Sequence, residues 1–449
     1  MVIELERKYI IRLRRYRAHV ILSHFEMRGM GMTMINVAIL GYGVVGSGVA
    51  EVIRKNSDSI AKRAGKEIRV KWILDVLDFP DSPDKDVLTK NADDVFNDKE
   101  VDIVIETIGG ARIAAQFTRR ALEAGKSVVT SNKELVASQG PELLKLAMEK
   151  GVSYLFEASV GGGIPIIRPL NQCLAANEIK GITGILNGTT NYILTKMKKE
   201  GKSFEEALKE AQQKGYAEQN PTADIEGHDT CRKLAILSSI AFNEFVDFSN
   251  IYTEGITKVT TADMKYAEAL NSSIKLVAIS KKKGDRVFAR VSPAIISKDH
   301  PLANVEDVFN AIVVKGDAIG DAMFYGRGAG KLPTASAVVA DVIDIAKHPG
   351  FQGGSAWVRT NENNVISIDE CSARFLVRVA TEKASEAKAD ILALFGEVEF
   401  IDLGSKVQRV EVAFITPVHT EKELFEKLTK LKNMSSVSDI ANSIRIEED

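Results

Sequence analysis

An aspartate and a lysine stand at the spacing that a proton-transferring site needs. Asp229 and Lys233 are four residues apart, so on a helix their side chains share one face and can meet. A lysine held in this way can give a proton to a carbonyl oxygen or take one from a hydroxyl group. Spacing alone favours an ordinary surface ion pair, so the rest of the chain must decide between the two interpretations.

A second lysine follows a short apolar segment. Lys133 comes after SVVT, with Ser131 and Asn132 between, and Thr107 follows the apolar segment VDIVIE in the same way. In a doubly wound α/β sheet, ligands bind at the carboxyl ends of the strands. We therefore expect Lys133 and Thr107 to line a cleft, the alternative for Lys133 being a surface cation at a strand end.

A glycine-rich turn follows the first apolar run. The text INVAIL leads into a turn with three glycines, and helical spacing of Val49, Val52 and Ile53 follows. The first glycine suits a tight turn, the second lets backbone approach a pyrophosphate, and the third lets helix and strand pack closely. We predict nucleotide binding rather than a purely structural turn, with these contacts: Gly41, Tyr42, Gly43, Val44, Val45 and Gly46.

The coenzyme type stays open at this level. The second strand is expected over 68–77 and ends near Asp75 and Asp78, either of which can lie beside an adenine ribose. An acidic residue there favours NAD, but both lie further from the turn than the usual ~20 residues. NAD and NADP therefore both remain candidates.

The elements around these residues alternate between strand and helix. Apolar runs at 35–40, 68–77 and 101–110, with a helix predicted over 112–124, indicate a Rossmann-type domain of α/β class. Further on, a strand over 182–186 is expected to lead through the segment NGTTN to a helix beginning near Tyr192. The polar groups of NGTTN either cap that helix or face a substrate.

The order of five segments resembles the homoserine dehydrogenase family. These segments are GYGVVG, SNKELVA, EASVGGGIP, NGTTNYIL and GYAEQNPTADIEGHDTCRK, and the match spans about 35–346. The resemblance implies an NAD- or NADP-dependent enzyme that interconverts L-homoserine and L-aspartate 4-semialdehyde, in the route to threonine, methionine and isoleucine.

The resemblance also implies roles for individual residues. Asp229 and Lys233 match catalytic positions, with Lys133 as a second lysine at the site, in contact with the coenzyme or sharing the proton relay. Glu218 resembles the carboxylate that binds the substrate ammonium, with Gly215 and Tyr216 shaping its loop and Asp229 as a second substrate contact. Gly330, before a helix expected over 334–346, resembles a glycine that touches the coenzyme.

A monovalent cation is implied near the segment EASVGGGIP. The family places sodium there, held by backbone carbonyls and a carboxylate; the alternative is a loop that needs positive φ. The residues carried over are Glu157, Val160, Gly162 and Ile164. His228 and its acidic neighbours fit no zinc motif, so we predict no divalent metal.

The last part of the chain has a different character. Its apolar and helical patterns predict the order βαββαβ, with strands over 375–380, 398–403, 407–415 and 442–446 and helices over 385–395 and 420–431. This ferredoxin-like order resembles an ACT domain. The family's effector turn has an acidic residue followed by Pro-Gly, whereas the turn Thr381–Ala384 reads TEKA. Subunit pairing is therefore favoured, and amino-acid regulation stays an alternative.

Composition limits the remaining classes of function. The net charge of −2 disfavours nucleic acid as a partner, although residues 1–34 are a basic extension with seven Arg or Lys against three Glu. Three scattered cysteines indicate a reducing, cytoplasmic setting, and no run is apolar enough to span a membrane. We expect a homodimer or homotetramer.

The sequence thus predicts three domains joined by one linker. Their expected ranges are 35–160 with 326–347 for NAD(P) binding, 161–325 for an α+β substrate-binding and dimerisation domain, 348–372 for the linker, and 373–449 for the ACT-like domain. Two alternatives to the enzyme remain: a catalytically silent amino-acid or nucleotide sensor, and another amino-acid semialdehyde dehydrogenase or reductase on the same fold.

Overall fold

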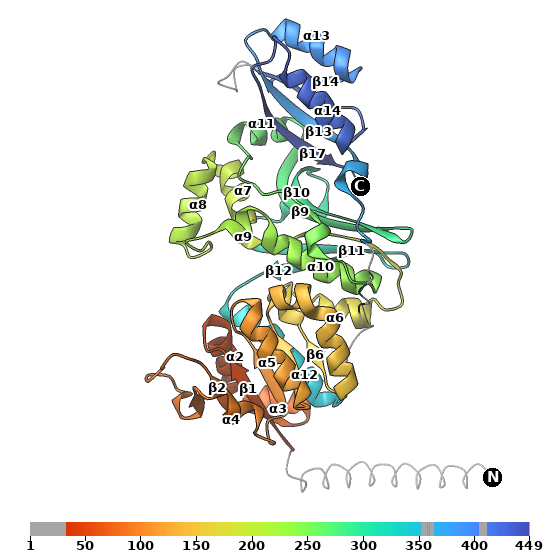
Figure 1. Cartoon of the computed structure of the whole chain (residues 1–449). Coiled ribbons are helices and arrows are strands. Elements are labelled where there is room, and N and C mark those ends of the chain that lie inside the picture. The colour runs from red at the N-terminus through yellow and green to blue at the C-terminus, as the bar shows by residue number, and fades with distance from the viewer. Residues whose placement is uncertain (1–32, 352–356, 358, 360–362, 404–410, 449) are drawn as a thin grey trace, which may run out of the picture.

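A computed structural model describes the chain except for residues 1–32, 352–356, 358, 360–362, 404–410 and 449 (Figure 1). The predicted basic extension over 1–34 therefore lies outside the described residues, apart from its last two. Within the described part, no helix is both long and apolar enough to cross a membrane.

The first sheet has six parallel strands, as a Rossmann-type domain requires. Its strands are rich in Val and Ile because helices cover both faces. The order is β3-β2-β1-β4-β5-β6, which places the first strand centrally. The bounds are β1 (Met34–Leu40), β2 (Glu67–Leu74), β3 (Leu88–Thr89), β4 (Ile103–Glu106), β5 (Ser127–Thr130) and β6 (Tyr154–Leu155).

Six helices pack around this sheet. One of them, α12, comes from much later in the chain and returns to the first domain, where Figure 1 shows it in cyan among the orange elements. Its Val338 and Val342 share a core with Val49 and Ile53 of the helix that follows the glycine turn. The bounds are α2 (Val44–Lys55), α3 (Ser57–Ala64), α4 (Ala92–Phe96), α5 (Ala111–Glu123), α6 (Lys133–Lys150) and α12 (Lys331–Lys347).

A second, larger sheet forms the middle of the molecule. Its middle part runs β12-β11-β7-β9-β10 and is antiparallel, with β8 on one side of β10. The strands are β7 (Ile179–Ile185), β8 (Tyr252–Thr253), β9 (Ser272–Lys283), β10 (Arg286–Ser297), β11 (Phe309–Gly316) and β12 (Gly320–Arg327). The helices are α7 (Gly188–Glu200), α8 (Phe204–Gln213), α9 (Thr222–Ile225), α10 (His228–Phe242) and α11 (Thr261–Ala269).

The C-terminal module follows the predicted order βαββαβ. Its sheet order, β17-β13-β15-β14, is antiparallel throughout. The predicted strand over 407–415 is seen as β15, and its first part lies outside the described residues. The bounds are β13 (Ser372–Ala380), α13 (Ala384–Phe395), β14 (Glu399–Ile401), β15 (Glu411–Ile415), β16 (His419–Thr420), α14 (Glu421–Lys432) and β17 (Asp439–Glu447).

The module and the middle domain share one sheet, because β17 pairs in parallel with β10. Buried ion pairs reinforce this junction. Arg445 of β17 lies 2.5 Å from Glu421 and 2.5 Å from Glu254 of the middle domain. Arg378 of β13 likewise lies 2.7 Å from Asp263 of α11. The C-terminal module is therefore docked through both backbone pairing and desolvated charge.

Two of the backbone stretches that connect the first domain with the middle domain lie against each other. The Gly163 N–H donates to the Arg327 carbonyl at 3.1 Å. Gly162 has a φ of 58°, and a Cβ built there would stand 2.3 Å from the Gly328 carbonyl oxygen. Only glycine fits this close contact between the crossing segments.

Candidate active site

The glycine turn is shaped for close backbone contacts. Gly41 has a φ of 87°, and a Cβ added to Gly46 would stand 1.9 Å from the Gly41 carbonyl oxygen. The Thr107 hydroxyl lies 2.9 Å from both the Leu40 and Gly41 carbonyl oxygens. A Cβ on Gly43, by contrast, would meet no protein atom within 4 Å. The turn is thus closed on its protein side and open where a dinucleotide would approach.

Tyr42 and Asp75 support this turn from behind. Tyr42 is buried, its ring packs edge-on against Phe79, and its hydroxyl donates to Asp84 at 2.6 Å. The Asp75 carboxylate accepts the Tyr42 N–H at 2.6 Å and the Leu77 N–H at 2.9 Å. Strand β2 ends at Leu74, earlier than predicted, so Asp75 begins a loop beside the turn. Its carboxylate is already engaged with backbone.

Asp78 and Gly330 lie at the edges of the same region. Asp78 is exposed and paired with Lys90 at 2.8 Å, a surface contact. Gly330 has a φ of 125° and immediately precedes α12. The first residue of that helix contacts α2, because a Cβ on Gly48 would stand 3.0 Å from the Lys331 carbonyl oxygen. Gly330 is therefore near the helix that starts at the glycine turn.

Lys133, Asp229 and Lys233 come together as a cluster. Lys133 is the first residue of α6, which Asn132 caps by accepting the Leu135 N–H. Its Nζ lies 2.6 Å from Asp229 Oδ1, across the two domains. Lys233 Nζ lies 2.8 Å from Asp229 Oδ2 and donates to the Leu186 carbonyl at 2.8 Å. One buried carboxylate thus accepts two ammonium groups.

Asn187 and Asp224 extend the cluster. The Asn187 side-chain amide donates to Asp229 at 3.0 Å and to Asp224 at 2.7 Å. Its carbonyl oxygen caps α7 by accepting the Thr190 N–H. Helix α7 therefore starts at Gly188, earlier than the predicted start near Tyr192, because the polar segment NGTTN supplies the cap and the first turn. The capping alternative is confirmed, and the same side chain also orients two carboxylates.

Charge and burial oppose each other in this cluster. Burial raises the pKa of Asp229, but the two lysines outweigh burial and hold that pKa below its usual range. Burial lowers the pKa of Lys133, yet attraction to Asp229 gives a net upward shift. The pKa of Asp224 is raised by burial and by repulsion from Asp229. Near neutral pH the centre holds an ionised aspartate between its cations.

The loop of Gly215, Tyr216 and Glu218 is braced from the side. Gly215 has a φ of 72° and Tyr216 is partly exposed. The Tyr216 carbonyl accepts the Thr189 hydroxyl at 2.6 Å, and its ring lies 5.1 Å from that of Tyr192. Glu218 is exposed at the end of the loop. Among the described residues, no hydrogen bond or ion pair joins the Glu218 carboxylate to the lysine cluster, and its predicted role in substrate binding stays a prediction.

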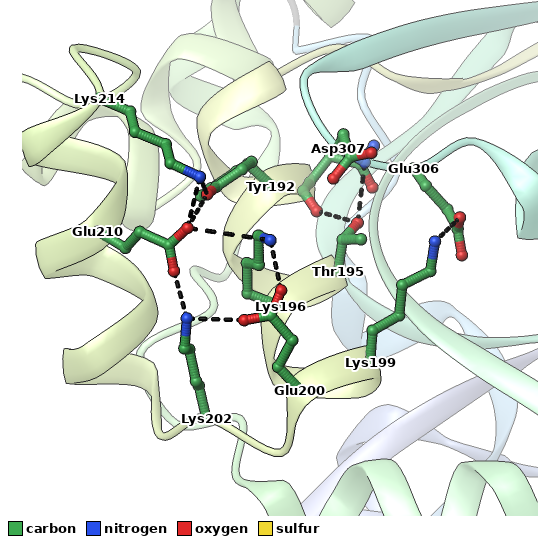
Figure 2. A network of polar contacts seen from close by, with 11 residues as sticks. Tyr192, Thr195, Lys196, Lys199, Glu200, Lys202, Glu210, Lys214, Glu306 and Asp307 are labelled. Atoms are coloured by element: carbon green, nitrogen blue, oxygen red, sulfur yellow. Dashed lines mark hydrogen bonds and ion pairs between the residues drawn. The ribbon is translucent and has the colours of Figure 1, made fainter.

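Tyr192 is held in turn by a charged network between α7 and α8 (Figure 2). Its hydroxyl donates to Glu210 at 2.6 Å and accepts from Lys214 at 2.9 Å. Lys202 also bonds to Glu210, so that carboxylate is surrounded by cations. These contacts hold the pKa of Glu210 below its usual value. The network fixes the tyrosine against which the loop packs.

Glu157 has a structural use in its loop. It is buried, and its carboxylate accepts backbone N–H groups from Ile166 at 2.6 Å, Ile167 at 2.8 Å and Arg168 at 2.7 Å. Both oxygens are thereby engaged. The role of Glu157 as a cation ligand beside backbone carbonyls stays a prediction. Val160, Gly162 and Ile164 lie in the same buried loop.

No divalent metal centre is seen near His228. Among the described residues, no three or more His, Cys, Asp or Glu side chains gather as metal ligands would. Asp224 and Asp229 instead meet through Asn187. Of the acidic residues near His228, Asp224 and Asp229 therefore belong to the lysine cluster.

Comparisons with known proteins match almost the whole chain. Two family models match it: "Homoserine dehydrogenase, NAD binding domain" over residues 41–157 and "Homoserine dehydrogenase" over residues 165–343. A homoserine dehydrogenase of Neisseria gonorrhoeae is 38% identical over 440 residues, covering 93% of this chain and 99% of that protein.

Solved structures agree. The crystal structure of a homoserine dehydrogenase from Thiobacillus denitrificans matches with a TM-score of 0.84 and 37% identity, covering 93% of this chain and 100% of that one. A hyperthermophilic archaeal homoserine dehydrogenase in complex with NADPH matches with a TM-score of 0.60 and 31% identity, covering 71% of this chain and 100% of that one.

Proposed function

The chain belongs to the homoserine dehydrogenase family, whose members are oxidoreductases of amino-acid biosynthesis. From this premise we propose which residues bind the substrate and transfer the proton. The reaction interconverts L-homoserine and L-aspartate 4-semialdehyde. A nicotinamide coenzyme, when bound, supplies the group that takes or gives the hydride. The protein must hold the substrate against it and serve the substrate oxygen with a proton.

The shared carboxylate of Asp229 is the observation that carries the proposal. The Lys133 side chain is 43% exposed, whereas that of Lys233 is 9% exposed. The Lys233 ammonium is also bonded to both the Asp229 carboxylate and the Leu186 carbonyl. Lys133 is therefore the lysine that a substrate oxygen can reach. In the reduction, its ammonium donates a proton to the carbonyl oxygen; in the oxidation, neutral Lys133 takes the hydroxyl proton. Lys233 keeps Asp229 oriented and ionised.

The substrate's amino group is assigned to the braced loop. Glu218 offers an exposed carboxylate for a cation, and Gly215 and Tyr216 set the path of the loop toward it. Asp229 is a second candidate for the substrate ammonium.

Coenzyme reduction with L-homoserine at alkaline pH tests the lysine roles. We expect Lys133→Met to lower kcat by about 10² to 10⁴, and Lys233→Met to lower it while leaving a proton acceptor in place. Lys145→Met, on the same helix as Lys133 but exposed on the surface, is the matched control and should retain full activity. Wild-type kcat in the Lys133 variant would remove that lysine from the relay. A wild type that binds coenzyme without turnover would support the silent sensor.

We propose NAD as the preferred coenzyme. Asp75 directly follows β2, the position at which Rossmann-type domains hold an acidic residue for the adenine ribose, and its carboxylate bonds to the Tyr42 N–H of the glycine turn. A negative charge there would repel a 2′-phosphate. The NADPH complex belongs to the archaeal relative only. We expect a higher kcat/KM for NAD than for NADP. Asp75→Asn should bring the two kcat/KM values closer together. A preference for NADP that Asp75→Asn leaves unchanged would contradict this assignment.

We further propose a structural sodium ion held by the Glu157 carboxylate and by backbone carbonyls of Val160, Gly162 and Ile164. Glu157 also organises the loop through its three N–H contacts. No step of the reaction is assigned to the ion.

We also propose the predicted domain ranges. They are 35–160 with 326–347 for NAD(P) binding, 161–325 for substrate binding and dimerisation, 348–372 for the linker, and 373–449 for the ACT-like domain.

The C-terminal module is proposed to be an ACT-like domain that pairs subunits into a homodimer or homotetramer. Its antiparallel βαββαβ order supports this. The turn after β13 is closed by its own contacts, because the Thr381 hydroxyl donates to the Ser436 carbonyl and accepts the Lys383 N–H at 2.8 Å. A cytoplasmic location is proposed from the three unpaired cysteines, Cys173, Cys231 and Cys371.

A further inference from the structure

Glu106 is a buried acid that the reaction described above leaves without a use. It is the last residue of β4 and has no exposed surface. Its Oε1 accepts the Ile108 N–H at 2.6 Å, and its Oε2 accepts the Thr130 hydroxyl at 2.5 Å. Both partners are uncharged. A carboxyl group is costly to bury in such a setting, so its contacts call for an explanation.

The first contact reaches the coenzyme side. Ile108 follows Thr107, whose hydroxyl lies against the carbonyl oxygens at the start of the glycine turn. The Asn132 amide also donates to the carbonyl oxygens of Ile108 at 3.2 Å and Gly110 at 2.8 Å. Glu106 therefore holds the loop after β4 through the Ile108 N–H. The same loop bonds to the glycine turn through Thr107 and to the loop after β5 through Asn132.

The second contact reaches Lys133. Because the Thr130 hydroxyl gives its proton to Glu106, its oxygen is free to accept the Asn132 N–H at 2.9 Å. Asn132 then caps α6, and Lys133 is the first residue of that helix. A chain of three hydrogen bonds thus leads from Glu106 through Thr130 and Asn132 to Leu135, in the first turn of the helix that Lys133 begins.

We propose that Glu106 is a positioning residue for the hydride and proton transfers. One of its oxygens holds the coenzyme loop, and the other holds, through Thr130 and Asn132, the start of the helix that carries Lys133. The proposal rests on the proposed roles of the glycine turn and Lys133. A carboxylate suits this position because it offers one acceptor to each of two donors. A glutamine offers one acceptor and one donor, so it cannot accept from both.

The two arms can be separated by substitution. Thr130→Val removes only the arm that leads to Lys133, and Thr130→Ser restores it. We expect Thr130→Val to lower kcat on the order of tenfold to a hundredfold, with the Kd for NAD(H) unchanged within about twofold. Glu106→Gln should lower kcat and also weaken NAD(H) binding. A Thr130→Val variant with wild-type kcat would overturn the proposal.

Two controls distinguish positioning from loss of stability. In a Lys133→Ala background, Thr130→Val should cause no further loss, because its effect passes through the lysine; an equal loss in both backgrounds would contradict the proposal. Lys126→Met removes a buried side chain at the opposite edge of the same strands, where its Nζ donates to the Asp98 and Val101 carbonyls. It should lower the melting temperature and leave kcat and Kd unchanged.

Failure of the proposed function would look different. An inactive wild type would count against the lysine relay, and the coenzyme arm would still be measured by the Kd for NADH in the wild type and in Glu106→Gln. Unchanged NADH binding in a folded Glu106→Gln protein would overturn that arm. If Glu106→Gln does not fold, the Thr130 pair still tests the arm to Lys133.

Discussion

Asp229 accepts an ammonium on each of its oxygens, and this arrangement sets the proton affinity of the cluster. Without an opposing charge, burial would lower the pKa of Lys133 and raise that of Asp229. Their mutual attraction reverses both shifts. A protonated Lys133 suits reduction of the aldehyde, whereas oxidation of homoserine needs the neutral lysine.

The pH profile of homoserine oxidation should therefore respond to the aspartate. Oxidation should accelerate as the pH rises toward the raised pKa of Lys133. Asp229→Asn removes the attraction, so we expect the midpoint of this rise to move to lower pH by about one to three units, with a lower maximal rate. The measurement is kcat/KM against pH for both proteins. If the midpoint does not move, Asp229 does not set the pKa of the group that titrates in the pH profile.

Glu106 gives a second prediction at the residue scale, on stability. Burial raises its pKa to about 7, although the hydrogen bonds from Thr130 and Ile108 lower it. The folded state then binds more protons than the unfolded state between the ordinary glutamate pKa and pH 7. Stability is consequently lost as the pH rises through that window, by about 3 kcal/mol.

Urea unfolding of wild type and Glu106→Gln at pH 5 and pH 7.5 measures this cost. The glutamine does not titrate. From pH 5 to pH 7.5 the unfolding free energy of the wild type should therefore fall relative to that of the variant by about 2 kcal/mol. If wild type and Glu106→Gln differ in unfolding free energy by the same amount at both pH values, Glu106 has the same pKa in the folded and unfolded chain.

Some of these contacts follow from the sequence and others do not. The meeting of Asp229 and Lys233 follows from helical spacing and is confirmed. The approach of Lys133 depends on how two domains dock, which local patterns do not encode. Glu106 was missed, although an acid at the end of an otherwise apolar strand is a visible signal of a buried carboxylate.

At the scale of elements, the strand–turn–helix unit shows how two glycines differ. Gly46 faces the protein, where a Cβ would collide with the Gly41 carbonyl, whereas Gly43 faces open space. We expect Gly46→Ala to lower the melting temperature of the coenzyme-free protein. Gly43→Ala should leave that temperature unchanged and weaken NAD(H) binding by about tenfold or more. Thermal unfolding and coenzyme titration distinguish the two variants. Equal melting temperatures for Gly46→Ala and Gly43→Ala would contradict this prediction.

Element types were easier to predict than their ends. The strands and helices of the first domain were expected from their apolar periodicity, because both faces of that sheet are covered. Strand β2 nevertheless ends at Leu74, where Asp75 turns to accept backbone N–H groups. Helix α7 starts earlier than expected, because Asn187 caps it. In both cases a single polar side chain set the boundary.

At the scale of the whole molecule, the shared sheet makes the C-terminal module part of the catalytic body. Arg445 is 2% exposed in its side chain and bonds to Glu421, which is fully buried. Arg445→Met would strand that carboxylate, so we expect a loss of about 3 to 5 kcal/mol. Adding Glu421→Leu should recover much of it. Denaturant unfolding of the single and double variants checks this; no recovery would mean that the other contacts of Arg445 dominate.

Domain docking was the part of the molecule least accessible from sequence. The βαββαβ order was foreseen from its pattern, but nothing local indicates that β17 pairs with β10. That pairing joins residues about 150 positions apart, and such long-range contacts leave no periodic trace.

The close contact of the two connecting segments has a mechanical consequence. Gly163 is bonded to Arg327 where the two segments cross, and α6 of the first domain also packs against α10 of the middle domain. The Lys133–Asp229 ion pair is a further bond between the same two domains. We expect any separation of the two domains at this point to require that this bond breaks. Release of product and transfer of the proton would then be governed by one and the same contact.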